Sequence, residues 1–293
     1  MDSPNWMTGA MASDEKAAQV EVDGAQIAYS VWGDTSNPGM ILIHGSNAHR
    51  HWWQWVAPYL ARRFRVAAID LSGHGDSDWR EAYSGETFAK EVIAVCRDAE
   101  LGEKPVVVAH SFGGFVGLET AHQYGDQLRG VVFADFTVAP RAQYVEWGNQ
   151  RAERGGPARP TRIYEDRDVA LGRYRLIPEQ PNRYPEVLAF LAEKSLRAVD
   201  GGWTWKFDPT LFDDLEMGID QTDKFEALRC PSALILGEHS TDEGAYFADH
   251  MIRVAPYAVP SITLYETHHH FMLEEPIATV LSLIHISEPT RPY

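Results

Sequence analysis

Short apolar runs alternate with amphipathic stretches along most of the chain, which is the pattern of a mostly parallel α/β sheet. Six apolar runs are predicted as strands: 40–44, 65–70, 106–109, 131–135, 233–236 and 262–265. Helical periodicity is found between them, over 53–63, 86–99, 113–124 and 242–254. An opening hairpin is predicted from 18–22 and 26–32, joined at Asp23-Gly24.

The alternation stops between residues 141 and 220 and resumes afterwards. This stretch is rich in Arg, Pro, Tyr and Trp, and it contains helical pieces such as 184–198 but no strong strand signal. We therefore expect residues 18–140 and 221–280 to form the α/β core, and residues 141–220 to form a helical cap inserted into it.

Both ends of the chain look foreign to this pattern. Residues 1–17 carry three methionines in a polar, small-residue stretch, and we expect them to be disordered or to precede the true start. The run 281–291 resembles the conceptual translation of a transposase-type sequencing adapter. We expect residues 281–293 to be a non-native tail that replaces the natural sequence after Val280; an ordinary helix end is the alternative.

Composition narrows the range of partners. The net charge of −16 and the pI near 5.1 disfavour nucleic acids and anionic membranes. No apolar run is long enough to span a bilayer, and the first residues lack the features of a signal peptide. Two distant cysteines, Cys96 and Cys230, do not imply a disulfide framework, so we expect a cytoplasmic protein, either a monomer or a homodimer.

A serine between small residues follows the strand predicted at 106–109. The sequence Ala109-His110-Ser111-Phe112-Gly113 leads into the predicted helix 113–124. A sharp strand-to-helix turn with serine at its tip is the nucleophile elbow, whose pattern is G-x-S-x-G. Alanine at position 109 departs from that pattern, although it is the next smallest residue. Ser111 is therefore the candidate nucleophile; a surface serine beside a glycine turn is the alternative.

The strand before Gly45 supplies a candidate oxyanion hole. Acyl transfer needs preorganised N–H donors for the tetrahedral oxyanion, and these are expected after the nucleophile and in the loop that follows this strand. The candidates are the backbone N–H groups of Ser46 and Phe112. We interpret His44 as a residue that braces the loop. The run 70–77, Asp-Leu-Ser-Gly-His-Gly-Asp-Ser, is interpreted as an architectural turn.

Together these motifs resemble the α/β-hydrolase superfamily, in its serine-nucleophile form, over residues 25–280. A late H-x-x-x-x-E-x-P motif, from His269 to Pro276, occurs in the family's order. The resemblance implies an eight-stranded sheet, a helical cap inserted after Asp135, a covalent acyl-enzyme and no cofactor. Haloalkane dehalogenases and epoxide hydrolases of this fold use an aspartate nucleophile, so serine at position 111 points away from both.

The general base is expected late in the chain, because the order of this fold is serine, acid, histidine. Residues 268–270 are all histidine, and the motif selects His269, seven residues before Pro276. A shift by one residue is possible, because His268 stands where glycine is usual. A histidine cluster is also a candidate metal site, but neither H-x-H-x-D-H nor H-E-x-x-H is present. We expect no metal.

The position of the acid is the open question. The usual aspartate of a G-x-x-D pattern is replaced here by Ser240, with Asp242 two residues further on. Some members of the superfamily place the acid after the preceding strand, where this chain has Asp135. We favour Asp135 and keep Asp242 as the alternative. The alternative interpretation is that Asp135 is an ordinary residue at the end of a strand, without a catalytic role.

The expected function is hydrolysis of carboxylic esters, or of related thioesters or lactones, by a Ser-Asp-His triad. Trp52, Trp53 and Trp147 are candidate pocket residues, which favours a small apolar or aromatic ester-like substrate. These tryptophans are equally compatible with core packing. The alternatives are a C–C bond hydrolase acting on vinylogous diketones with the same triad, and a slow or non-enzymatic ligand sensor.

Overall fold

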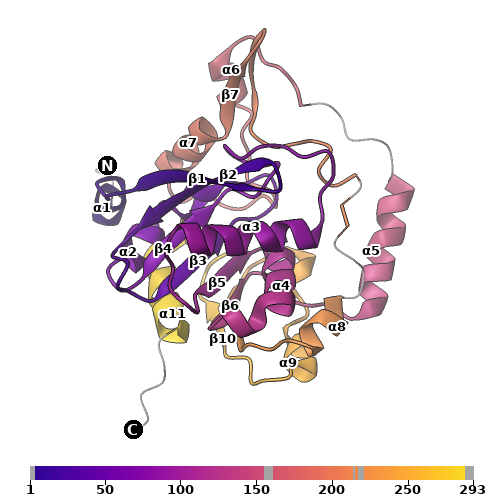
Figure 1. The fold of residues 1–293 in the computed structure, drawn as a ribbon. Coiled ribbons are helices and arrows are strands. Elements are labelled where there is room, and N and C mark those ends of the chain that lie inside the picture. The colour runs from indigo at the N-terminus through magenta and orange to yellow at the C-terminus, as the bar shows by residue number, and fades with distance from the viewer. Residues whose placement is uncertain (1–3, 155–160, 214, 217–220, 288–293) are drawn as a thin grey trace.

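The computed structural model describes residues 4–154, 161–213, 215–216 and 221–287. Eight strands form one sheet, which lies at the centre of the molecule (Figure 1). Their order across the sheet is β1-β2-β4-β3-β5-β6-β9-β10. β2 pairs antiparallel with both β1 and β4, and all other neighbours are parallel. The predicted mostly parallel eight-stranded α/β sheet is therefore confirmed. The strands are β1 (Lys16–Val22), β2 (Ala25–Trp32), β3 (Gly39–Ile43), β4 (Arg65–Ile69), β5 (Val106–His110), β6 (Gly130–Ala134), β9 (Ser232–Gly237) and β10 (Ser261–Leu264).

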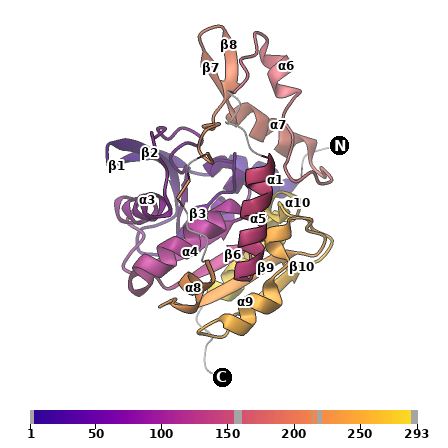
Figure 2. The same cartoon turned by 90° about the vertical axis from the view of Figure 1, so that its right-hand side faces the viewer.

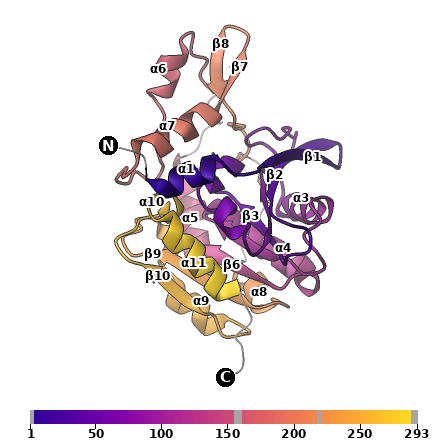
Figure 3. The ribbon, with the colours of Figure 1, turned by 90° about the vertical axis from the view of Figure 1, so that its left-hand side faces the viewer.

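Alternate residues of the central strands enter two separate cores, one on each face of the sheet. In β5, Val107 and Ala109 belong to one core, and Val106 and Val108 belong to the other. The first core is covered by α3 (Gly85–Asp98), α4 (Phe112–Tyr124), α8 (Gln221–Glu226) and α9 (Ala248–Val254) (Figure 2). The second is covered by α1 (Asn5–Met11), α2 (Ala57–Leu60), α10 (Phe271–Glu274) and α11 (Pro276–Ser287) (Figure 3). Burial on both faces explains why the strands are continuous apolar runs.

Local sequence accounts for the best-formed surface helix, α3. Ser84 caps its first turn by accepting a hydrogen bond from the N–H of Thr87, at 3.1 Å. Glu86 in the first turn and Arg97 in the last turn complement the helix dipole. By contrast, the single helix predicted over 53–63 is a 3₁₀ turn at Arg50–Trp53 followed by the short α2.

The insert between β6 and β9 lies over one end of the sheet (Figure 1) and is not purely helical. It contains α5 (Arg141–Arg154), α6 (Arg167–Leu171) and α7 (Pro185–Lys194), followed by a hairpin of β7 (Leu196–Val199) and β8 (Gly202–Trp205). The hairpin departs from the predicted helical cap. Its signal is Asp200-Gly201-Gly202, a turn sequence between β-forming residues. Residues 155–160, 214 and 217–220 of the predicted cap lie outside the described residues.

Both ends of the described chain are packed against the core. α1 buries Met7 and Ala10 against the second core, and Gln54 Nε2 donates to the Ala10 carbonyl at 3.2 Å. Where disorder or a segment before the true start was expected, the structure has the helix α1, packed through apolar side chains, and the start of β1. α11 continues to Ser287 with Leu283 fully buried; residues 288–293 lie outside the described part. None of the described helices is long and apolar enough to cross a membrane.

Candidate active site

Ser111 stands at a tight turn between β5 and α4, as the elbow motif predicts. Its backbone has a positive φ of 53° with ψ −124°, a strained combination outside the three main allowed regions. A Cβ at Gly113 would lie 2.5 Å from the His44 carbonyl, so the position two residues after the serine must be glycine. A Cβ at Gly117 would lie 2.6 Å from the Cβ of Ala109. Glycine at 117 thus makes room for the alanine that departs from the motif.

Three side chains from three distant parts of the sequence form a continuous hydrogen-bond chain. Ser111 Oγ lies 2.9 Å from His269 Nε2, and His269 Nδ1 lies 2.6 Å from Asp135 Oδ2. Because a carboxylate accepts hydrogen bonds, Nδ1 carries the proton and donates it to Asp135. Nε2 then presents its lone pair to the serine hydroxyl, which is the arrangement that a general base requires.

The Asp135 carboxylate is buried and held from several sides. Its Oδ1 accepts from the N–H of Gly237 at 2.8 Å, and its Oδ2 accepts from the Ser240 hydroxyl as well as from His269. Its side chain has no exposed surface. Ser240, which stands in the usual position of the acid, therefore donates a hydrogen bond to the carboxylate at the end of β6. Asp135 itself has a positive φ of 48°, which is uncommon for a residue other than glycine.

Asp242 lies on the other side of the imidazole. Its Oδ2 is 3.7 Å from His269 Nε2, the nitrogen that faces Ser111, while its Oδ1 accepts from the N–H of Gly244 at 2.8 Å. The side chain is 33 % exposed. From this position it does not meet the Nδ1 proton, so the structure brings Asp135, and not Asp242, to the nitrogen that a triad acid must hold.

The predicted oxyanion donors lie at two neighbouring loop ends. Phe112 begins α4, so its N–H has no acceptor within the helix. Ser46 follows β3, which is the neighbour of β5 in the sheet. The loop before Ser46 is fixed by His44, whose Nδ1 donates to the Gly45 carbonyl at 2.7 Å and whose Nε2 accepts from the N–H of Leu71 at 3.1 Å. Burial lowers the pKa of His44, which fits this neutral bracing role.

The run 70–77 forms the architectural loop that the sequence predicts. Asp70 is fully buried and paired with Arg50, and it also accepts from the N–H of Asp76 at 2.8 Å. Ser77 Oγ donates to the Asp70 carbonyl at 2.6 Å and accepts from the N–H of Ala28 at 2.8 Å. The bonds of Ser77 connect the loop to β2. The Asp70 carboxylate is engaged by Arg50 and by the N–H of Asp76, and not by His269.

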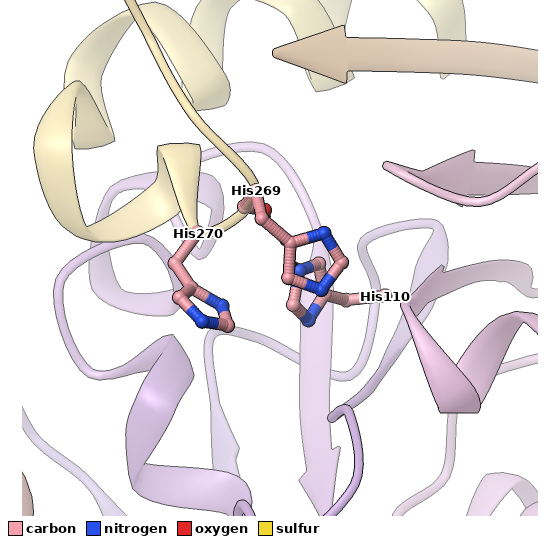
Figure 4. A group of neighbouring side chains, drawn as sticks. All are labelled: His110, His269 and His270. Atoms are coloured by element: carbon pink, nitrogen blue, oxygen red, sulfur yellow. Dashed lines mark hydrogen bonds between the residues drawn. The ribbon is translucent and has the colours of Figure 1, made fainter. Parts of the chain in front are cut away.

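Two further histidines, His110 and His270, flank the base (Figure 4). Sequence reasoning considered His270 only as a member of the histidine cluster and assigned no role to His110. His110 Nε2 donates to the His269 carbonyl at 2.9 Å and so supports the loop that carries the base. His270 is buried, and neither of its ring nitrogens makes a hydrogen bond of normal geometry with a described residue. Burial, together with the nearby His269, lowers the pKa of both flanking histidines well below the usual value. The imidazoles beside the base are therefore neutral.

The same three histidines offer nitrogen atoms within 4.8 Å of one another, which is the kind of donor set that borderline metals prefer. In the hydrogen-bonded arrangement described above, however, both nitrogens of His269 are engaged by Ser111 and Asp135. A metal ion held by His269 would have to break one of these bonds. The absence of a metal from the reaction remains a prediction.

The three candidate tryptophans lie in three different settings. Trp52 lines a cavity of about 320 Å³ between the Ser46 loop and the insert. Trp53 is 1 % exposed and belongs to the second core. Trp147 donates from Nε1 to Glu243 at 3.0 Å and packs against Phe247, away from that cavity. Trp53 and Trp147 therefore pack against other residues in this structure, which is the alternative to a role in the pocket.

Four aromatic residues of the insert line the cavity with Trp52: Tyr164, Tyr174, Trp205 and Phe207. None of them is among the three tryptophans predicted for the pocket. The richness of the insert in Tyr and Trp was the available signal, but which rings face the cavity depends on the hairpin and its neighbouring loops. His49, beside the cavity, also joins the core to the insert through a 2.9 Å hydrogen bond to Ser195.

The fold and the elbow define a class of protein. The model of the α/β hydrolase family matches residues 40–283, and the chain belongs to that family. It is 28% identical over 197 residues to 2-(acetamidomethylene)succinate hydrolase of Mesorhizobium japonicum, covering 67% of this chain and 68% of that protein. It is also 28% identical over 226 residues to esterase Rv0045c of Mycobacterium tuberculosis, covering 75% and 72%.

Solved structures agree on the fold. The crystal structure of E-2-(acetamidomethylene)succinate hydrolase superposes with a TM-score of 0.76 at 22% identity, covering 92% of this chain and 98% of that one. The thioesterase domain from the curacin biosynthetic pathway superposes with a TM-score of 0.75 at 22% identity, covering 92% and 99%. The similarity therefore extends over nearly the whole of both chains.

Proposed function

We propose that the protein hydrolyses carboxylic esters, or related thioesters or lactones, through an acyl-enzyme on Ser111. The observation that carries this proposal is the unbroken hydrogen-bond chain from Ser111 Oγ through His269 to Asp135. Nucleophilic acyl transfer uses three groups: a serine, a base that accepts the serine proton, and a buried acid that holds the other nitrogen of that base.

In the proposed reaction, Ser111 Oγ attacks the ester carbonyl while His269 Nε2 accepts the hydroxyl proton. Asp135 stabilises the imidazolium that forms, and the N–H groups of Ser46 and Phe112 bind the oxyanion. The tetrahedral intermediate collapses, His269 protonates the leaving alcohol, and the acyl group stays on Ser111. A water molecule, deprotonated by the same nitrogen, then attacks the acyl-enzyme and releases the acid.

The names of the relatives all indicate hydrolysis, but of different chemical bonds. One is an esterase, another is a hydrolase of 2-(acetamidomethylene)succinate, and a third, 27% identical over 135 residues, is a haloalkane dehalogenase of Sphingobium indicum. The dehalogenase match covers 44% of each chain. Serine at position 111 favours acyl chemistry over dehalogenation, because dehalogenases of this fold use a carboxylate nucleophile.

The test combines turnover with labelling of the nucleophile. We expect the protein to hydrolyse 4-nitrophenyl esters and to be labelled by a fluorophosphonate probe, and we expect Ser111→Ala to abolish both. Ser240→Thr serves as a control, because it alters a nearby hydroxyl without touching the nucleophile. Labelling of Ser111 without turnover of any ester, thioester or lactone would refute ester hydrolysis and favour C–C bond cleavage. Absence of labelling would refute an active nucleophile and favour a ligand sensor.

A further inference from the structure

The cavity beside the oxyanion loop carries an unusual charge. Two of its lining residues, Arg173 and Arg175, are cationic, and none is acidic. The chain as a whole is the opposite, with 42 acidic against 26 basic residues. From the overall composition, a cavity would be expected to have more acidic than basic lining residues, so the two arginines need another explanation.

In the described part of the chain, these two arginines also lack the carboxylate partners that several other arginines have. Several arginines elsewhere pair with carboxylates, and they include Arg50, Arg80, Arg183 and Arg229. Among the described residues, Arg173 and Arg175 have no carboxylate partner. Arg175 donates to the Gly172 and Tyr174 carbonyls, at 3.0 and 2.6 Å, which fixes its position without neutralising its charge. Both guanidinium groups therefore remain available to an external anion.

The cavity adjoins the proposed oxyanion loop. Ser46, one of the proposed oxyanion donors, forms part of its wall. Trp52, another part of the wall, stacks edge-on against His270 at a centroid distance of 4.9 Å, and His270 lies 4.7 Å from the ring of the base. The wall also contains aromatic rings, Tyr174 and Trp205 among them. A substrate in the cavity would thus meet the oxyanion loop, aromatic side chains and two cations.

We propose that this cavity binds an ester whose apolar or aromatic body ends in a carboxylate, held by Arg173 and Arg175. The proposal rests on the proposed ester hydrolysis and names its substrate class. Guanidinium groups match carboxylates in geometry and form charge-assisted hydrogen bonds with them. Because the rest of the protein repels anions, a local pair of cations is what would make an anionic substrate acceptable.

The kinetic test uses matched substrates of equal chain length. The mono-4-nitrophenyl ester of adipic acid carries a remote carboxylate, and 4-nitrophenyl hexanoate is its neutral counterpart. For Arg173→Gln/Arg175→Gln, we expect kcat/KM on the adipate ester to fall about tenfold or more, mainly through KM, as loss of charge-assisted bonds predicts. Activity on the hexanoate ester should change less than about twofold. The double lysine variant should keep part of the preference, because it keeps the charge.

Arg97→Gln is the control variant. Arg97 lies on α3, where its side chain contacts Gln127 on the surface, and its removal changes the net charge by the same unit as either single substitution. It should alter neither substrate's kinetics. An adipate-to-hexanoate ratio that is the same in the wild type and in Arg173→Gln/Arg175→Gln would overturn the proposal while leaving ester hydrolysis intact.

A binding experiment separates this proposal from the proposed function. Calorimetry on Ser111→Ala would compare N-benzyladipamic acid with N-benzylhexanamide, two amides that differ only in the terminal carboxylate. We expect the acid to bind about tenfold more tightly at low salt and to lose that advantage in the arginine double variant and at high salt. Equal affinities for the acid and the neutral amide would refute the anion site, whichever bond the enzyme hydrolyses. Tighter binding of the acid, combined with no ester turnover by the wild type, would refute only the ester chemistry.

Discussion

The ends of β6 and β9 each carry an aspartate close to His269, and the two differ in burial and in direction. Asp135, after β6, has no exposed side-chain surface and accepts three hydrogen bonds, one of them from His269 Nδ1. Asp242, after β9, is one-third exposed and approaches Nε2. The difference teaches that proximity to a base does not define a triad acid. The acid must hold the far nitrogen from a site that water does not reach.

The largest expected effect comes from replacing each acid in turn. Asp135→Asn would place an amide NH₂ against Nδ1 and favour the wrong tautomer, so kcat should fall by about 10³- to 10⁴-fold. Asp242→Asn should change kcat by less than about fivefold, since loss of a partly exposed charge is screened by water. Ester turnover, with circular dichroism to verify folding, measures both. The opposite ranking would move the acid to β9.

An exchange of the two residues at the carboxylate tests whether the end of β9 is able to carry the acid. Ser240 Oγ lies 2.5 Å from Asp135 Oδ2, so an aspartate at 240 would enter the same site. We expect Asp135→Ser/Ser240→Asp to recover about 10- to 100-fold of the activity lost in Asp135→Ser, because the carboxylate again meets Nδ1. A folded double variant with no recovery would indicate that only β6 gives the required direction.

Removing the serine hydroxyl alone should have a smaller effect. Ser240→Ala deletes one of the bonds that hold Asp135, and we expect kcat to fall about five- to tenfold, the range of one net hydrogen bond. Ser240→Thr, which keeps a hydroxyl, should stay near the wild-type value. Full activity in Ser240→Ala, measured with the same esters, would show that Gly237 and His269 suffice to orient the acid.

The contrast between buried and exposed polar groups also predicts how stability depends on pH. Burial, followed by the nearby His44, lowers the pKa of His74 well below the usual value, so the unfolded chain binds a proton that the folded chain excludes. This contribution to stability is present above about pH 6.5 and is lost as the pH falls below it.

We therefore expect the free energy of unfolding to fall between pH 7.5 and 5.5, and to fall less steeply in His74→Asn, by up to about 1.4 kcal/mol per pH unit. Urea unfolding at each pH measures this slope. His239→Asn, at a side chain that is about half exposed, is the control and should leave the slope unchanged. Parallel slopes in the wild type and in His74→Asn would contradict the prediction.

Much of the core was predictable because it obeys local rules. The strands are apolar runs buried on both faces, and the elbow needs small residues beside Ser111. The insert was less predictable, since its hairpin signal, Asp200-Gly201-Gly202, is short and lies among helices. The same holds for α1, whose helix is anchored by a few apolar contacts with the core that the local pattern does not reveal.

The sequence by itself determined the mostly parallel sheet, the turn at Ser111, the late histidine and two candidates for the acid, because each depends on residue types at fixed local spacing. Only the tertiary structure decided between Asp135 and Asp242, since that choice depends on which nitrogen of His269 each carboxylate meets. It also decided which rings and arginines line the cavity. Direction and burial arise where segments distant in the chain converge, and no local pattern records them.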